Sequence, residues 1–196
     1  MENSQMELQH INVKLFLRNP ELVELEPLVP VFQNWIQDQK PGELLIDVAD
    51  YRHIEAGPGV MLIGHEGNYS VDNTDGRLGV RYNRKASLAG SNWDRLKQAA
   101  LSAITACQRL ESEPRLGGKI GFDGQTVEIL VNDRLLAPNN VASREAFKSD
   151  FEQFAQKLFS GSEYSMSYEN DPRRLFAVTV KAAQTFSAAD LLERLS

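Results

Sequence analysis

Cysteine is nearly absent from this sequence, because Cys107 is the single one among 196 residues. One thiol excludes an intramolecular disulfide and any zinc site that is built from several cysteines. Long apolar runs are missing too, since none approaches the roughly 20 residues that a helix needs to cross a bilayer. The first seven residues have neither the basic flank nor the apolar stretch of a secretion signal. We therefore expect a cytoplasmic protein without a membrane partner.

Positive charge is in the minority. The chain has 21 lysine and arginine residues against 27 aspartate and glutamate residues, which gives a net charge of −6 at pH 7. A protein with a net negative charge repels phosphate backbones, so we expect no nucleic-acid partner. The hydrophobic fraction of 42% is that of an ordinary folded domain. We expect residues 1–10 to form a polar tail and residues 11–196 to form a single compact domain.

The spacing of apolar residues predicts a mixed α+β fold with a largely antiparallel sheet. Short apolar stretches bounded by turn residues indicate strands at 11–17, 44–48, 60–63, 69–71, 78–82, 119–122, 127–131, 163–168 and 175–181. Stripes at helical spacing indicate four helices, which begin near residues 28, 91, 143 and 187. Because 44–48 is apolar on both faces apart from Asp47, we expect it at the centre of the sheet.

Several local signals refine these elements. Ser91 with Asp94, and likewise Ser187 with Asp190, have the spacing of a capping box. Ser143 is expected to cap the third helix, and Asp123-Gly124 to form the turn of a hairpin between 119–122 and 127–131. Cys107 lies on the apolar stripe of the second helix, which favours an inert buried thiol over a nucleophile.

The predicted elements follow a similar order in the two halves of the chain. Counted from Val13 and from Val127, both halves run through a strand, a helix and two further strands, so the chain can be divided into two βαββ units, within 11–115 and 116–196. The residue identity between the two units is weak. The alternative is that an α+β chain of this length contains this order without any internal repeat.

The segment between the second and fourth predicted strands concentrates the residue types of acid–base and metal chemistry. It contains Asp47, Asp50, His53, His65, Glu66 and Tyr69. If its first two strands pair antiparallel, Asp47 lies opposite Met61, and His65 lies about 20 Å from His53. A single metal ion could not reach both histidines in that arrangement. We therefore predict no metal site, and the sequence identifies no cofactor.

Acid–base catalysis is one interpretation of this segment. His65 would act as a base oriented by Glu66, with support from Asp47 or Asp50, in a small hydrolase-type enzyme with or without a metal ion. No serine or cysteine in a nucleophile-elbow context accompanies them. The alternative is that these side chains form hydrogen bonds with the backbone of their own loops.

A basic strip interrupts the otherwise acidic sequence between residues 77 and 97. Its cations are Arg77, Arg81, Arg84, Lys85, Arg95 and Lys97. Alternation along a strand places Arg81 and Asn83 on one face, and a helix N-terminus follows closely. The strip predicts a small anionic ligand, bound by Arg81, Asn83, Arg84 and Lys85 with help from His53 and Tyr69. The alternative is that these cations offset nearby acidic side chains.

Four segments carry a resemblance to known proteins. They are 43–53, 57–69, 78–85 and 131–139, which read ELLIDVADYRH, GPGVMLIGHEGNY, LGVRYNRK and VNDRLLAPN. These segments resemble a family of uncharacterised bacterial proteins, and the resemblance spans most of the chain. It implies a bacterial, cytoplasmic protein. That family has no assigned activity, so the resemblance implies no catalytic residues.

Two hypotheses about function follow from the residues. The first is a non-catalytic ligand-binding or protein-interaction module that self-associates as a homodimer, through the basic strip or through a sheet edge. The second is the small hydrolase-type enzyme built on His65 and Glu66. The partners expected under the first hypothesis are a small anionic ligand, another protein, or a second copy of the chain.

Overall fold

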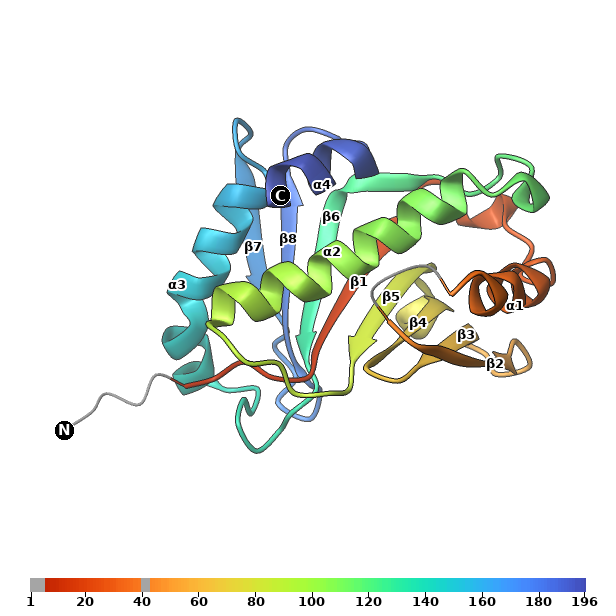
Figure 1. The fold of residues 1–196 in the computed structure, drawn as a ribbon. Helices are drawn as coiled ribbons and strands as arrows, with labels where there is room; N and C mark the ends of the chain where they lie inside the picture. Colours follow the sequence, from red (N-terminus) through yellow and green to blue (C-terminus); the bar gives the residue numbers. More distant parts are fainter. Residues whose placement is uncertain (1–5, 40–42) are drawn as a thin grey trace.

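The computed structural model describes residues 6–39 and 43–196, and its centre is one antiparallel sheet of eight strands (Figure 1). The order across the sheet is β2-β3-β4-β5-β1-β6-β8-β7. The strands are β1 (Ile11–Leu17), β2 (Leu45–Tyr51), β3 (Gly59–Gly64), β4 (Gly67–Asp72), β5 (Gly79–Arg84), β6 (Phe122–Val131), β7 (Tyr164–Tyr168) and β8 (Phe176–Ala182). This architecture confirms the mixed α+β class expected from the sequence.

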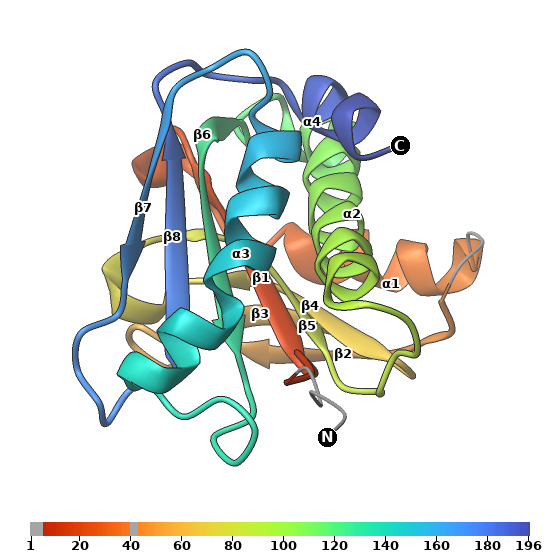
Figure 2. The ribbon, with the colours of Figure 1, turned by 90° about the vertical axis from the view of Figure 1, so that its left-hand side faces the viewer.

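Four α-helices occur in the described residues, and they pack against one face of the sheet. They are α1 (Leu28–Asp38), α2 (Asn92–Glu111), α3 (Val141–Leu158) and α4 (Ala188–Leu195), with short 3-10 turns at Pro20–Leu22, Thr74–Gly76 and Pro114–Leu116. Figure 2 shows α2 and α3 lying over the sheet with α4 beside α2. None of the helices in the described parts of the chain is long and apolar enough to span a membrane.

The helix ends test the local signals directly. Both capping boxes are confirmed, because the Ser91 and Ser187 hydroxyls accept from the backbone N–H groups of Asp94 and Asp190, whose carboxylates accept in return. The start of α3 was predicted wrongly. Asn140, not Ser143, is its N-cap, and the Asn140 side chain accepts the backbone N–H of Ser143. The sequence also predicts that Pro41-Gly42 ends the first helix, and these two residues lie outside the described part of the chain.

The hairpin expected at Asp123-Gly124 is wrong, because both residues lie within β6 and the chain does not reverse direction there. Asp123 Oδ1 accepts hydrogen bonds from the backbone N–H groups of Gln125 and Thr126. The side chain therefore stabilises a local irregularity in the strand, and the chain does not reverse here. The pairing of β1 with β6 shifts register at this point. The turn residues therefore form a bulge in a long strand.

The expected central position of 44–48 is also wrong, because β2 is an edge strand. Leu44 and Ile46 are 58% and 53% exposed, so half of this apolar stretch faces solvent. Asp47 pairs with Ile63, not with Met61, because the register shifts between Leu45 and Asp47. Apolar residues on both faces are typical of a central strand, but here one face borders α1 and the other is open.

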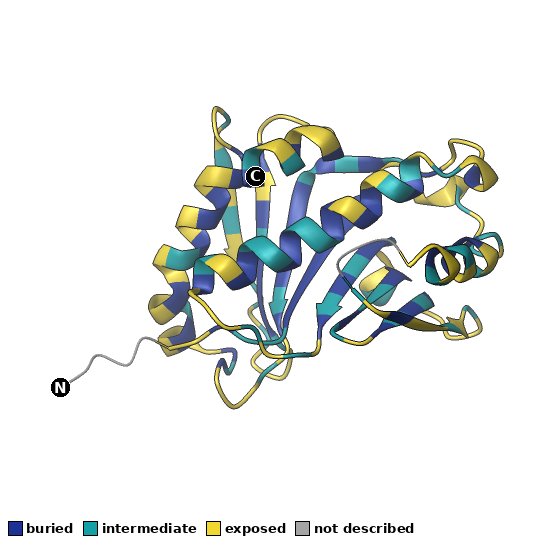
Figure 3. Cartoon of the chain, viewed as in Figure 1, coloured by how far each residue is buried: buried dark blue, intermediate teal, exposed yellow. Residues whose placement is uncertain are grey.

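The two faces of the sheet differ in chemistry. The face under the helices is apolar and packs against the apolar stripe of α2. Cys107 lies on that stripe and is fully buried, as expected. Figure 3 shows buried residues on the helix surfaces that face the sheet. The opposite face holds a buried ion pair, in which Lys14 Nζ lies 2.6 Å from Asp72 Oδ1 and the side chains are 1% and 2% exposed. Arg81 Nη1 lies 3.2 Å from Asp72 Oδ2.

The order of elements in the structure is β1-α1-β2-β3-β4-β5-α2 followed by β6-α3-β7-β8-α4. The two blocks meet at the antiparallel pair β1–β6 in the middle of the sheet. In each block the last strand lies beside the first one, as β5 does with β1 and β8 with β6. The internal repeat stays a prediction.

Candidate functional site

A cavity of about 340 Å³ lies on the helix-covered face, between α1, α2 and strands β2 to β4. Its size is at the lower end of the range for small-molecule sites. The lining residues are Trp35, Glu43, Leu45, Leu62, Glu66, Tyr69, Gln98, Leu101, Ser102, Thr105, Ala106 and Arg109. We call it the α1–α2 pocket. Its walls are mainly apolar, and a few polar groups converge in it, which is the usual character of a ligand site.

The aromatic floor of the pocket follows from strand pairing. Tyr69 on β4 is paired with Tyr82 on β5, and their rings are 4.9 Å apart. Gly67 lies against Tyr82, since a Cβ atom at Gly67 would come within 2.6 Å of the Tyr82 ring. Gly64 lies against Glu43 in the same way, with 2.8 Å between such a Cβ and Glu43 Oε1. The two glycines let the β3–β4 turn close onto the pocket wall.

Glu43 is the most perturbed acid of the pocket. Tyr69 Oη donates to Glu43 Oε2 over 2.9 Å. The other oxygen, Oε1, is fully buried and has no partner of normal hydrogen-bond geometry among the described residues. Burial raises the pKa of Glu43 above its ordinary value, although the hydroxyl of Tyr69 and the backbone N–H of Gly67 oppose this. Burial, and then the negative charge of Glu43, also raise the pKa of Tyr69.

Helix α2 contributes one polar row to the pocket. Gln98 Nε2 donates to Tyr82 Oη over 3.3 Å and to Ser102 Oγ over 3.0 Å. Gln98 Oε1 is buried and has no hydrogen-bond partner within the described chain. At the far end, the guanidinium of Arg109 lies 3.8 Å from the centre of the Trp35 ring. Burial lowers the pKa of Arg109. The pocket therefore has a polar end at Glu43 and Gln98 and an indole wall.

Of the residues predicted to be catalytic, the pocket includes Glu66 alone. Arg84 Nη1 forms an ion pair with Glu66 Oε2 at 2.8 Å. His65 is exposed in the β3–β4 turn, while Asp47 is exposed on the edge strand β2. Asp50 is bound by its neighbour Arg52, and this contact lowers the pKa of Asp50 to about 2. The predicted catalytic residues thus do not share one site.

The residues predicted to bind an anion have partners inside the protein. Arg81 contacts Asp72, and Arg84 contacts Glu66. Lys85 Nζ donates to the carbonyl of Gly64 over 2.6 Å. A shallow depression is lined by Asn83, Lys85 and the buried Arg84, beside His10 and Arg134. The anion-binding strip stays a prediction, and its cations already serve the fold.

His53 and Tyr69, the remaining predicted ligand residues, lie apart. Tyr69 lines the α1–α2 pocket, whereas His53 is exposed in the turn between β2 and β3. The antiparallel pairing of these strands puts His53 and His65 at opposite ends, as the strand geometry predicts. No group of three or more metal-ligating side chains occurs among residues 6–39 and 43–196.

Sequence reasoning missed most of the pocket. Helical spacing predicts that Trp35 packs in the core, and the predicted site residues do not include Gln98, Ser102 or Arg109. A signal was present, because 98, 102, 105 and 109 recur at the spacing of one helix face and form a polar row beside the apolar stripe of α2. Glu43 had no such signal, since its position depends on the register of β2 with β3 and on the β3–β4 turn.

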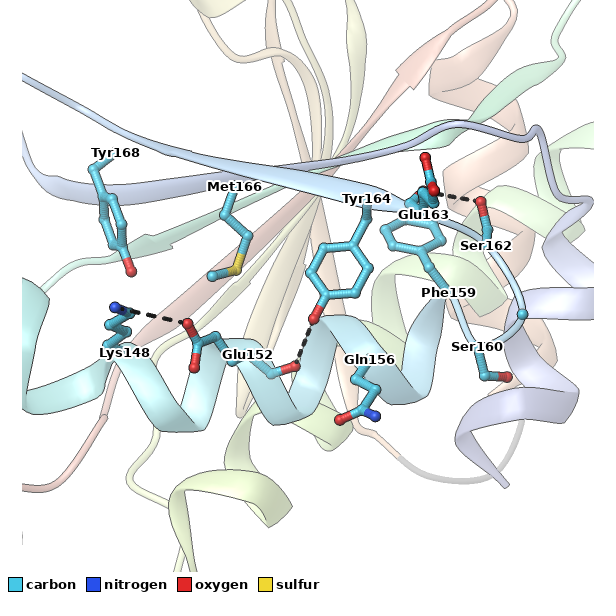
Figure 4. Close-up of a pocket in the computed structure, with 11 residues that line it drawn as sticks. Lys148, Glu152, Gln156, Phe159, Ser160, Ser162, Glu163, Tyr164, Met166 and Tyr168 are labelled. Atoms are coloured by element: carbon cyan, nitrogen blue, oxygen red, sulfur yellow. Dashed lines mark hydrogen bonds and ion pairs between the residues drawn. The ribbon is translucent and has the colours of Figure 1, made fainter.

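A second and more open hollow lies between α3 and β7 (Figure 4). Some of its polar side chains have partners within it, while the buried Tyr168 hydroxyl has none among the described residues. Lys148 Nζ lies 4.0 Å from Glu152 Oε1, and Tyr164 Oη donates to the carbonyl of Glu152 over 3.4 Å. This hollow has no half-buried acid like Glu43, so the α1–α2 pocket is the better candidate for a small molecule.

Comparison of the chain with protein-family models, curated proteins and solved structures finds no match.

Proposed function

We propose that the protein binds a small organic molecule in the α1–α2 pocket, and that this molecule has an apolar body and a cationic N–H head group. One observation carries the proposal. The half-buried Glu43 carboxyl lies in a cavity large enough for a ligand, and its buried Oε1 accepts no hydrogen bond of normal geometry among the described residues, since the contact of the carboxyl with the backbone N–H of Gly67 falls outside that geometry. A buried acceptor without a donor costs about 1–3 kcal/mol, and a donor on a ligand removes that cost when Glu43 turns toward it.

The charge at the Glu43 end of the pocket selects the head group, because the cation that lines the cavity, Arg109, lies at the far end against Trp35. Glu43 and Glu66 both line the cavity, and the negative charge of Glu66 contributes to the raised pKa of Glu43. An ammonium or amidinium group favours the ionised form of Glu43, whereas a ligand carboxylate would be repelled by both acids. The apolar body of the ligand would lie against Trp35, Leu62 and Leu101.

The proposal keeps the ligand-binding hypothesis of the sequence analysis, but it changes the location of the site and the charge of the ligand. The expected ligand is a cation in the α1–α2 pocket, in place of an anion on the basic strip. A cytoplasmic location and a bacterial source accompany it as hypotheses. The hydrolase built on His65 and Glu66 stays a prediction that no contact in the described chain favours.

A matched series of ligands tests the proposal. 2-Phenylethylamine, 2-phenylethanol and 3-phenylpropanoate share an aromatic body and differ in the head group. The chain has two tryptophans, Trp35 and Trp93, so Trp93→Phe assigns the indole N–H signal of Trp35 in a ¹H–¹⁵N spectrum. We expect the amine to shift that signal at the lowest concentration and the acid to leave it unchanged.

Glu43→Gln provides the decisive variant, because it removes the charge and keeps an acceptor for Tyr69. A hydrogen bond to a charged group contributes about 1.5–3 kcal/mol, so the variant should bind the amine about 10- to 150-fold more weakly. Binding of the alcohol should change little. Glu55→Gln, at an exposed position, is the control. The proposal is wrong if none of the three compounds shifts the Trp35 signal, or if Glu43→Gln binds the amine like the natural chain.

A further inference from the structure

The sheet has two edges, and they are protected to different degrees. At one edge, β2 exposes the charges of Asp47 and Asp50 and shifts register against β3. At the other edge, β7 pairs with β8 alone in the described chain, without a register shift. Exposed charges and bulges are the usual devices that prevent a sheet edge from pairing with another chain. β2 has both, and β7 has neither.

The sequence of β7 is suited to pairing with itself. It reads Tyr-Ser-Met-Ser-Tyr from Tyr164 to Tyr168, with no charge, proline or glycine. An antiparallel copy centred on Met166 would place Tyr164 opposite Tyr168 of the second copy and serine opposite serine. Tyrosine pairs across neighbouring strands are favourable, and no like charges oppose each other within the strand. The half-buried Tyr164, Met166 and Tyr168 would extend the apolar face that they already form with the core.

The hollow between α3 and β7 lies next to this edge, so α3 of each copy would flank the paired strands. Figure 4 shows Lys148 below Tyr168 and the Glu152 carboxylate beside it, below Met166, while the backbone carbonyl of Glu152 accepts from the Tyr164 hydroxyl. A two-fold axis at Met166 exchanges the two ends of β7 and would place the Lys148–Glu152 pairs of both copies on the same side of the extended sheet.

We propose that β7 pairs antiparallel with β7 of a second copy, so that the sheet continues through a two-fold symmetric homodimer. The interface is self-complementary, as a two-fold dimer requires. The paired strands satisfy the free backbone groups of both edges. The hollow next to β7 is filled by Lys148, Glu152 and the tyrosines of both copies. The proposal does not depend on what the α1–α2 pocket binds.

Light scattering on a size-exclusion column tests this interface. The chain has a mass of 22.0 kDa, and we expect a particle of twice that mass that dissociates on dilution. Met166→Lys places two like charges at the two-fold axis and should yield the monomer. Ile46→Lys makes the same kind of change on the other edge strand, at a residue that is 53% exposed, and should leave the dimer intact. Circular dichroism reports whether each variant is folded.

A charge exchange within β7 keeps the test valid even if Met166→Lys does not fold. Ser165 and Ser167 are exposed, and Ser165 of one copy would lie opposite Ser167 of the other. Ser165→Lys/Ser167→Lys places like charges opposite each other and should weaken the dimer by about tenfold, whereas Ser165→Lys/Ser167→Glu places opposite charges there and should keep the dimer. A monomer at every concentration overturns the proposal, and so does a dimer that Met166→Lys or the double-lysine variant leaves unchanged.

Discussion

Replacing Asp72 by asparagine should cost the protein about 3–5 kcal/mol of its free energy of unfolding, because the change leaves a buried lysine without its counterion. Lys14 Nζ lies 2.6 Å from Asp72 Oδ1, and both side chains are at least 98% buried. Asparagine keeps an oxygen for the backbone N–H of Thr74, which Asp72 now accepts. The substitution removes the charge, and its amide nitrogen also replaces the oxygen that accepts the Thr74 hydroxyl and pairs with Arg81.

The size of this effect can be checked in two ways. For a chain of this length, about 3–5 kcal/mol corresponds to a fall in melting temperature of about 6–20 °C. Burial lowers the pKa of Lys14, so the lysine in the variant can lose its proton at high pH. The folded variant then binds fewer protons than the unfolded chain, and its stability should recover as pH rises toward 10.5, the ordinary lysine value.

Urea denaturation of four proteins provides the assay. These are the natural chain, Asp72→Asn, the double variant Lys14→Met/Asp72→Asn, and Asp50→Asn. The double variant removes the orphaned charge and should regain much of the stability. Asp50 forms an equally short ion pair with Arg52, at 2.7 Å, but in an exposed position, so Asp50→Asn should change stability little. If Asp72→Asn costs no more than Asp50→Asn, the burial argument is refuted.

Two further predictions concern the pocket and the bulge in β6. Because the pKa of Glu43 is raised in the folded protein, the folded chain binds more protons than the unfolded chain above pH 4.5, and its stability falls as pH rises through the raised value. Glu43→Gln should lack this component, so denaturation curves of the two proteins should diverge with pH; parallel curves would contradict the prediction. Gly124→Ala would place a Cβ 1.6 Å from the carbonyl oxygen of Phe186 and should prevent stable folding. Gly118→Ala, with φ +71° and open space around it, should cost about 1–2 kcal/mol, from backbone strain alone; equal melting temperatures for the two variants would contradict this.

Interactions between residues close in sequence made parts of the fold predictable. The capping boxes at Ser91 and Ser187 join residues three positions apart, so each can be recognised directly in the sequence. The buried position of Cys107 follows from helical spacing, since one face of α2 must face the sheet. The hairpin signal at Asp123-Gly124 failed although it is also local. Those residues suit a bulge as well as a turn, and the pairing of β6 with β1 decided between the two.

The candidate site depended on contacts between distant parts of the chain. Glu66 and Tyr69 were identified because histidine and carboxylates cluster around them in the sequence. Trp35, Glu43 and Arg109 come from α1, the segment before β2, and the far end of α2. No periodicity relates these three positions. Their proximity results from α1 and α2 covering the same end of the sheet.

The sequence by itself determined the absence of an intramolecular disulfide, the mixed α+β class and three of the four helix starts. Each of these depends on composition or on residues within a few positions of one another. Only the tertiary structure decided that β2 is an edge, that Arg81 and Arg84 of the basic strip pair with Asp72 and Glu66, and that Glu43 is held half-buried by Tyr69. Strand order and side-chain partners depend on long-range packing, and the local pattern of a strand is compatible with more than one neighbour.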